Sequence, residues 1–258
     1  GGVAVFVDVH AHLDDKAFDG DREQVLENIR AAGMLVVTAG SDVETSRFSV
    51  ELARKYDFVY ACVGVHPHEA GKAPKDYLEE LKELAKDPKV LAIGEIGLDY
   101  YYEFSERRIQ QKVFLEQLEL AESLNLPVII HDRDAHQDTL SILKKSSPRG
   151  LMHCYSGSLE MARELLKLGF YFSFGGVITF KNAKRPREVV SQLPLDKILL
   201  ETDCPYLTPE PYRGKRNDPT KIPLIAQKLA ELHQVSLQEV EDITYANFTK
   251  LFGLAADS

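Results

Sequence analysis

The chain has 258 residues, of which 44% are hydrophobic and 28% charged, a composition typical of an ordinary globular protein. No apolar run reaches the roughly 18 residues that a membrane span needs, and a formal net charge of -9 excludes a general polyanion binder. Three scattered cysteines without a CxxC spacing argue against a disulfide scaffold or a thiolate zinc site, and indicate a reducing cytoplasm.

Short apolar runs alternate with longer amphipathic segments from the first residues onward. The beginning of the chain has no basic n-region and is expected to form a strand rather than a signal peptide. The predicted strands are Val3–Val9, Leu35–Ala39, Phe58–Val65, Val90–Glu95, Pro127–His131, Leu151–Cys154, Tyr171–Gly175 and Ile198–Glu201. The predicted helices are Asp21–Ala32, Val43–Tyr56, Lys75–Lys86, Ser105–Leu124 with Ser105 as N-cap, Asp134–Lys145, Leu159–Leu168, Arg187–Leu193, Lys221–His233 and Leu237–Phe252.

This alternation predicts an α/β fold, a (β/α)8 TIM barrel that forms a single domain over residues 1–258. Strands rich in Val, Ile and Leu suit an all-parallel sheet covered by helices. The main alternative is an open doubly wound sheet. It would favour a glycine-rich phosphate turn after a strand, and the sequence contains neither a GxGxxG nor a GxxxxGKS/T motif.

Histidines and carboxylates occur where the predicted strands end. They are His10, His12, His66, His68, Glu95, His131, His153 and Asp203. Because strand ends share one face of a parallel barrel, these groups are expected to converge there. A bound cation would offset the cost of burying them together. The alternative is a set of unrelated histidines, each satisfied separately in the core.

Nitrogen and oxygen ligands without a thiolate suit zinc, manganese, cobalt or, less readily, magnesium. Five or six ligands exceed the three that a single catalytic zinc takes. We therefore expect two divalent metal cations bridged by a carboxylate, an arrangement that recurs in phosphate-cleaving enzymes.

Several motifs together resemble the TatD-type deoxyribonucleases, which are metal-dependent hydrolases of the amidohydrolase-like barrel class. The matching positions are Phe6–Asp14, Gly64–His68, Gly94–Asp99, His131, His153–Gly157, Glu201–Pro205 and Arg213–Asn217. Val9 departs from the pattern, since a small residue is more usual there. The departure concerns local packing, because this position is not a ligand.

The resemblance implies roles for individual residues. His10, His12 and Asp203 would bind the first ion, His131 and His153 the second, and Glu95 both. A water between the ions would be the nucleophile, with Asp203 as general base. His66 would contact the scissile phosphate or transfer a proton, unless its role is structural.

Other polar residues are weaker candidates. Asp99 could orient a metal ligand, and His68 lies near the same strand ends. His136 and His233 fall on predicted helices and are expected to have no part in the chemistry. Glu201 lies in the last predicted strand and is not expected to be a ligand.

Two basic clusters follow the last two strands. The first contains Lys181, Lys184, Arg185 and Arg187, and the second contains Arg213, Lys215 and Arg216. Barrel enzymes often bind phosphate near these loops, so Arg213 and Arg216 are predicted phosphate contacts. Incidental charge on solvated loops is the alternative.

Four aromatic residues, Tyr100, Tyr101, Tyr102 and Phe104, follow the fourth strand. Their rings could stack on the bases of a single strand or pack the loop onto the barrel. The sequence leaves these two interpretations open.

The resemblance implies a phosphodiesterase that acts as a 3′→5′ exonuclease on single-stranded DNA. We expect a monomer with no membrane partner. The same metal site acting on an amide, lactone or aminoacyl ester is one alternative, and a non-catalytic metal-binding protein is another. No lysine ends a predicted strand, which favours bridging by Glu95 over a carbamylated lysine.

Overall fold

The computed structural model describes residues 3–254 of the chain. They form two compact units: the described residues of 1–37 and 171–258 make one, and Thr38–Phe170 the other. Residues 1–2 and 255–258 of the predicted domain lie outside the described part. The sheet has eight strands in the order β1-β2-β3-β4-β5-β6-β7-β8, as predicted for a (β/α)8 barrel.

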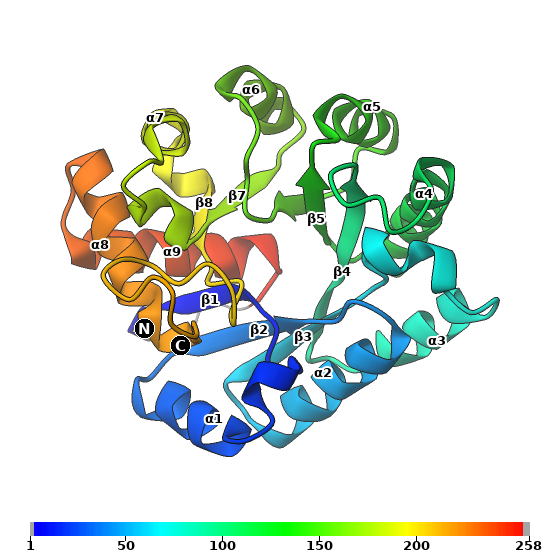
Figure 1. The fold of residues 1–258 in the computed structure, drawn as a ribbon, viewed down its shortest axis with the longest axis horizontal. Coiled ribbons are helices and arrows are strands. Elements are labelled where there is room, and N and C mark those ends of the chain that lie inside the picture. Colours follow the sequence, from blue (N-terminus) through cyan, green and yellow to red (C-terminus); the bar gives the residue numbers. More distant parts are fainter. Residues whose placement is uncertain (1–2, 255–258) are drawn as a thin grey trace. The chain divides into compact units, whose positions relative to one another are not determined.

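The elements follow the predicted alternation (Figure 1). The strands are β1 Val7–Ala11, β2 Leu35–Ala39, β3 Val59–Val63, β4 Val90–Asp99, β5 Val128–Arg133, β6 Gly150–Met152, β7 Tyr171–Phe174 and β8 Ile198–Leu200. The α-helices are α1 Arg22–Ala31, α2 Val43–Lys55, α3 Tyr77–Leu84, α4 Arg107–Leu124, α5 His136–Ser146, α6 Leu159–Lys167, α7 Lys184–Gln192, α8 Ile222–His233 and α9 Leu237–Leu251.

In the unit Thr38–Phe170, strands β3 to β6 pair in parallel, each with the next. Helix α2 packs on β3, and α4 packs on β4 (Figure 1). Every residue of β4 is buried, because helices cover the outer face and neighbouring strands fill the inner one. The chemistry-bearing side chains of this unit therefore project from a rigid layer.

In the other unit, β7 and β8 pair in parallel, and β1 lies against β8. Helix α9 packs on β8, where the amide of Asn247 donates to the carbonyls of Leu195 and Ile198. These two bonds satisfy backbone groups at the beginning of β8, which a buried strand requires.

Two strands differ from their predicted bounds at positions that matter. Strand β1 begins at Val7 rather than at Val3 and continues to Ala11, so His10 lies within it. Strand β4 continues to Asp99, because it pairs with β5 as far as Asp99 and Arg133. Glu95 therefore lies in the middle of a strand, not at its end.

Helices α4 and α7 are among those that begin at other residues than predicted. Helix α4 begins at Arg107, and Ser105 is not its N-cap. The Ser105 hydroxyl instead accepts the backbone N–H of Gly71 and donates to the carbonyl of His68. Helix α7 begins three residues early, at Lys184, so most of the first basic cluster is helical.

A glycine permits close approach of β4 to β5 beside the candidate site. Gly97 has φ of 145°, and a Cβ there would lie 1.9 Å from the carbonyl oxygen of His131. The register of the two strands also shifts between Ile93 and Ile96, on either side of Glu95. This irregularity changes the direction of β4 at Glu95, which carries the carboxylate of the candidate site.

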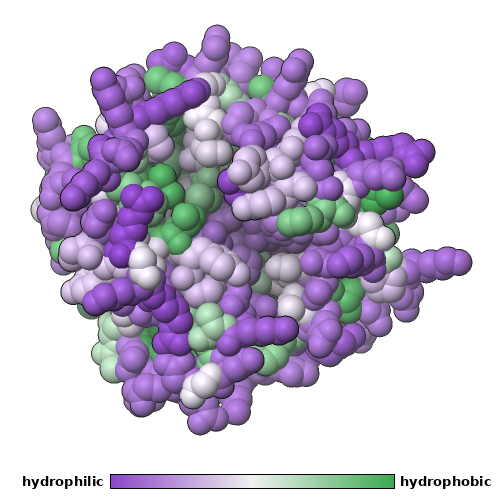
Figure 2. Space-filling view, viewed as in Figure 1, coloured by the Kyte–Doolittle hydropathy of each residue, from purple (hydrophilic) through white to green (hydrophobic). Residues whose placement is uncertain are grey.

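No helix among the described residues is long and apolar enough to cross a membrane. The face drawn in Figure 2 is mainly hydrophilic, with separate smaller hydrophobic patches.

Candidate metal centre

Three predicted ligands meet in the unit that contains β1 and β8, and we call them the β1/β8 cluster: His10, His12 and Asp203. Their candidate ligand atoms all lie within 4.8 Å of one another. The Nε2 atoms of His10 and His12 are 3.2 Å apart, and Asp203 Oδ1 lies 3.2 Å from the Nε2 of His12. Two imidazoles and a carboxylate oxygen at this spacing can bind one cation.

Backbone hydrogen bonds hold the cluster together. The N–H of Asp203 donates to the carbonyl of His10 at 2.8 Å, and the N–H of His12 donates to the carbonyl of Cys204 at 3.0 Å. Asp203 has φ of 57°, in the left-handed region, which turns its side chain back toward β1. The extended chain of β1 places His10 and His12 on the same side.

A buried carboxyl group anchors the same two segments. Asp8 accepts hydrogen bonds from the backbone N–H groups of His10 and Thr202 and from the Thr202 hydroxyl. Burial raises the pKa of Asp8 to about 8, although these hydrogen bonds work in the opposite direction. Asp8 thus joins the segment that carries His10 to the segment that carries Asp203, without being a predicted ligand itself.

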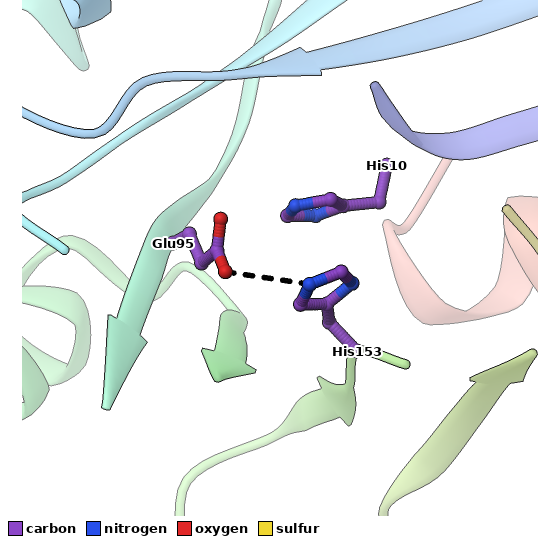
Figure 3. Close-up of side chains that lie close together, drawn as sticks. All are labelled: His10, Glu95 and His153. Atoms are coloured by element: carbon purple, nitrogen blue, oxygen red, sulfur yellow. Dashed lines mark ion pairs between the residues drawn. The ribbon is translucent and has the colours of Figure 1, made fainter. Parts of the chain in front are cut away.

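Three predicted ligands of Thr38–Phe170 and the predicted phosphate contact His66 lie together, and we call them the Glu95 cluster: His66, Glu95, His131 and His153. Glu95 Oε2 lies 2.9 Å from His131 Nδ1, 3.3 Å from His153 Nε2 and 3.4 Å from His66 Nε2. Figure 3 shows the side chains of Glu95 and His153 pointing toward each other. One carboxylate oxygen is therefore shared among three imidazole rings.

Asp99 holds His131 from the far side of the ring. His131 Nε2 lies 2.9 Å from Asp99 Oδ2, and His68 Nε2 lies at the same distance from that oxygen. Burial alone would lower the pKa of His131, but its hydrogen bonds with Asp99 and Glu95 raise it to about 9. If Nε2 donates to Asp99, then Nδ1 faces Glu95 with a lone pair, so a cation or a proton belongs between them.

His66 is bonded differently from the other histidines of the cluster. Its Nδ1 accepts the backbone N–H of His68 at 3.0 Å. Burial lowers the pKa of His66 to about 4, so the ring is neutral at physiological pH. In the neutral tautomer that accepts at Nδ1, Nε2 carries the proton and cannot bind a metal. His66 is therefore a hydrogen-bond donor within the cluster.

The donor chemistry of both clusters fits a divalent cation. Imidazole nitrogens and carboxylate oxygens are brought together in largely buried positions, and carboxylates are costly to bury without a partner charge. No thiolate is among these candidate ligands. The sets match the nitrogen and oxygen ligands of zinc, manganese, cobalt or magnesium sites.

The predicted phosphate contacts already have partners within their own unit. The Arg216 guanidinium forms two hydrogen bonds with the carboxylate of Asp21 and one with the carbonyl of Ala17. The Arg213 guanidinium lies 3.7 Å from the centre of the Phe180 ring, and its side chain is exposed. The N–H groups of Arg213 are therefore more available to a phosphate than those of Arg216.

The residues expected to have no part in the chemistry lie apart from the clusters. His136 pairs with Asp132 at the start of α5, and His233 at the end of α8 bonds the carbonyl of Val190. The Glu201 carboxylate accepts a hydrogen bond from the Ser173 hydroxyl. His68 contacts the Asp99 carboxylate, as described above, and is not within the Glu95 cluster.

Sequence reasoning missed two residues that build the site. Asp8 had a detectable signal, since it is an acid within the apolar run of β1. Gln110 of α4 had none: its side chain accepts the N–H of Asp99 and donates to the carbonyls of Asp99 and Ser105. Glutamine on a helix is common, and only the packing shows that this one is buried.

The parallel eight-stranded fold and the two histidine–carboxylate clusters define the class of protein as a metal-dependent hydrolase of the (β/α)8 barrel type. The family that matches, over residues 7–253, is described as TatD related DNase. The chain belongs to this TatD family.

The relatives agree in length as well as in sequence. The "Uncharacterized metal-dependent hydrolase YabD" of Bacillus subtilis is 46% identical over 249 residues, covering 95% of this chain and 98% of that protein. The "Uncharacterized metal-dependent hydrolase MJ1582" of Methanocaldococcus jannaschii is 34% identical, covering 96% of both chains. Among solved structures, the TatD homologue YjjV from Escherichia coli K12 has a TM-score of 0.91 at 33% identity, covering 97% of this chain and 98% of that chain.

Proposed function

We propose that the β1/β8 cluster and the Glu95 cluster together hold two divalent cations, with Glu95 bridging them. His10, His12 and Asp203 bind one ion, and His131 and His153 bind the other. The support is the fold, because the carboxyl ends of all strands lie on one face of a (β/α)8 barrel. The observation that carries the proposal is the sharing of Glu95 Oε2 among three imidazole nitrogens within 3.4 Å.

The reaction that fits this donor set best is hydrolysis of a phosphodiester bond. The proposed substrate is single-stranded DNA, degraded from its 3′ end; the family description supports DNA as the substrate class. Bound divalent cations supply a nucleophilic water at neutral pH and offset the charge of the phosphate. Without such cations, an anionic substrate would be repelled by the carboxylates of the two clusters.

Asp203 is the proposed general base. Its side chain is partly exposed, and Oδ1 faces the imidazoles of its cluster, so the carboxylate can take a proton from a nearby water. His66 has the complementary role, because its protonated Nε2 can donate to a phosphate oxygen while the ring stays neutral. Arg213 and Arg216 contact further phosphates, with Arg213 the more available of the two.

Three scattered cysteines without a CxxC spacing suit a reducing compartment, and we place the activity in the cytoplasm. We also expect a monomer. Mass measurement in solution tests the oligomeric state.

The proposed function is tested on single-stranded DNA labelled at either end, with magnesium, manganese, cobalt or zinc and with EDTA. We expect cleavage that needs metal, proceeds from the 3′ end and falls at least about 10³-fold in Glu95→Gln. Glu164→Gln on α6, an exposed carboxylate paired with Lys167, is the matched control and should keep full activity. The variant His131→Asn is tested in the same assay, and His136→Asn is its matched control.

A small phosphoester, an amide and a lactone are assayed in parallel. Metal-dependent turnover of the amide or lactone, with DNA untouched, would assign the same centre to a different bond. Absence of turnover with every metal, while metal still binds, would indicate a non-catalytic metal-binding protein.

A further inference from the structure

An exposed aromatic segment connects β4 to α4. Among the described residues, three of the eight large hydrophobic side chains that are exposed come from this segment: Tyr101 at 57%, Tyr102 at 47% and Phe104 at 68%. Tyr100 is the exception, because its hydroxyl donates to Asp138 and accepts from Gln111. The Tyr100 ring therefore packs the loop, while the other three rings face solvent. Exposure of large apolar rings to water is unfavourable, and a patch of them marks a binding surface.

Two of the exposed rings form a stacked pair. The centroids of Tyr102 and Phe104 are 5.3 Å apart, and their planes are inclined by only 7°. The edge of the His68 ring meets both, at 5.0 Å from the centroid of Phe104 and 5.5 Å from that of Tyr102. We call Tyr102 and Phe104 the aromatic platform.

A short chain of contacts joins the aromatic platform to the Glu95 cluster. His68, which touches both rings, bonds Asp99 Oδ2 at 2.9 Å. The same oxygen bonds His131, whose other ring nitrogen lies 2.9 Å from Glu95 Oε2. Two imidazoles and one carboxylate therefore connect the platform to Glu95.

The loop is held in shape before anything binds. Asp99 Oδ1 accepts the backbone N–H groups of Tyr101 and Tyr102, each at 3.0 Å. Buried Gln110 donates to the carbonyls of Asp99 and Ser105, so it clamps both ends of the segment. A rigid platform loses little conformational entropy on binding, which favours stacking of a flat ligand.

A cation accompanies the rings. The Arg133 guanidinium lies 4.1 Å from the centroid of Tyr101 and 5.0 Å from that of Tyr102. Flat exposed rings beside a guanidinium match a ligand that combines a planar ring with negative charge. An apolar peptide or lipid would use the rings but would gain nothing from the cation. The chemistry is that of a nucleotide within a single strand.

We propose that the aromatic platform stacks on the base of the nucleotide next to the scissile phosphate. This inference rests on the proposed nuclease function. Stacking would hold the terminal base beside the Glu95 cluster irrespective of its identity, because every base has a π-face. It would also favour unpaired ends, since a base that is free of a partner strand can leave its neighbour and offer its faces to the rings.

The test measures binding to the metal-loaded protein, with a strand whose 3′-terminal linkage is a phosphorothioate that resists cleavage. A single-stranded oligonucleotide carries the fluorescent base 2-aminopurine at its 3′ end, where stacking quenches emission. Tyr102→Leu with Phe104→Leu keeps apolar bulk but removes both rings, and should lose the quench and bind at least about ten-fold more weakly. Tyr102→Phe with Phe104→Tyr keeps both rings and should behave as the wild type. Leu115→Ala, an exposed apolar residue of α4, is the surface control.

An oligonucleotide with an abasic 3′ end completes the design. The wild type should bind it as weakly as the leucine variant binds the normal strand. Equal quenching by wild type and leucine variant, or equal affinity for normal and abasic strands, overturns the platform. If cleavage needs metal but the leucine variant quenches emission as the wild type does, only the proposal for the aromatic platform is wrong. If quenching depends on the rings and no metal supports cleavage, the platform stands and the proposed function fails.

Discussion

His131 Nε2 lies 2.9 Å from Asp99 Oδ2, on the opposite side of the ring from Glu95. Asp99 thereby selects the tautomer whose Nδ1 lone pair faces the proposed ion. A carboxylate behind a ligating histidine also raises its basicity, and its loss costs about 10–100-fold in metal affinity.

Asp99→Asn is accordingly expected to weaken metal binding by about 10–100-fold. The measurement is a metal titration by calorimetry in chelator-free buffer. Asp132→Asn is the matched control, since Asp132 bonds His136 in the same way but away from the clusters. Equal affinities for Asp99→Asn and the wild type would show that Asp99 only supports the loop.

The variant His66→Gln tests whether His66 donates a hydrogen bond to the substrate or binds a metal ion. Because Nδ1 of His66 accepts the His68 N–H, we expect metal stoichiometry and affinity to persist in this variant. The turnover number should fall about 10²–10³-fold, the usual cost of losing a donor to a charged transition state. Metal content by mass spectrometry and single-turnover kinetics measure the two effects. Loss of an ion in His66→Gln would make His66 a ligand after all.

Arg213 and Arg216 should differ in their effect on DNA binding. Arg213→Gln is expected to weaken binding and to reduce the salt dependence by about one unit of slope. Arg216→Gln should have a smaller effect on DNA, because its guanidinium is engaged by Asp21. Both variants should keep their metal. Affinities over a range of salt concentrations provide the comparison, and unchanged slopes in both variants would exclude phosphate recognition there.

Asp8→Ala should destabilise the fold itself. The change leaves the N–H groups of His10 and Thr202 buried without their acceptor, at a cost of about 2–4 kcal/mol in the free energy of unfolding. The variant Asp8→Asn keeps one carbonyl oxygen as an acceptor and should lose less of the free energy of unfolding. Urea unfolding in EDTA isolates this effect from metal binding. A change below about 0.5 kcal/mol in Asp8→Ala would mean that water replaces the carboxyl group.

Metal removal should lower thermal stability in the wild type. An ion present at 100 times its dissociation constant stabilises the native state by about 2.7 kcal/mol. Scanning calorimetry with EDTA, zinc, manganese, cobalt or magnesium should therefore rank the metals by their effect on Tm. The effect should shrink in Glu95→Gln, whereas identical Tm values with and without metal would argue against both clusters as metal sites.

The order of elements and the candidate ligands were predictable from the sequence, because both follow from local patterns. Apolar runs of strand length separated by amphipathic segments indicate parallel strands covered by helices. An acid or histidine at the end of such a run stands out, since burial is costly there. The strand bounds were wrong where pairing decided them, as in β4, which continues to Asp99 because β5 supplies hydrogen bonds that far.

By itself, the sequence determined which histidines and carboxylates lie in or just after the strands, and the fold that presents them. Only the tertiary structure decided how each is used. His66 is a donor because the His68 N–H occupies its other nitrogen, and Arg216 is engaged because Asp21 lies beside it. Hydrogen bonds and ring contacts between segments depend on distances of a few tenths of an ångström, and residue identity and spacing do not encode these without the fold.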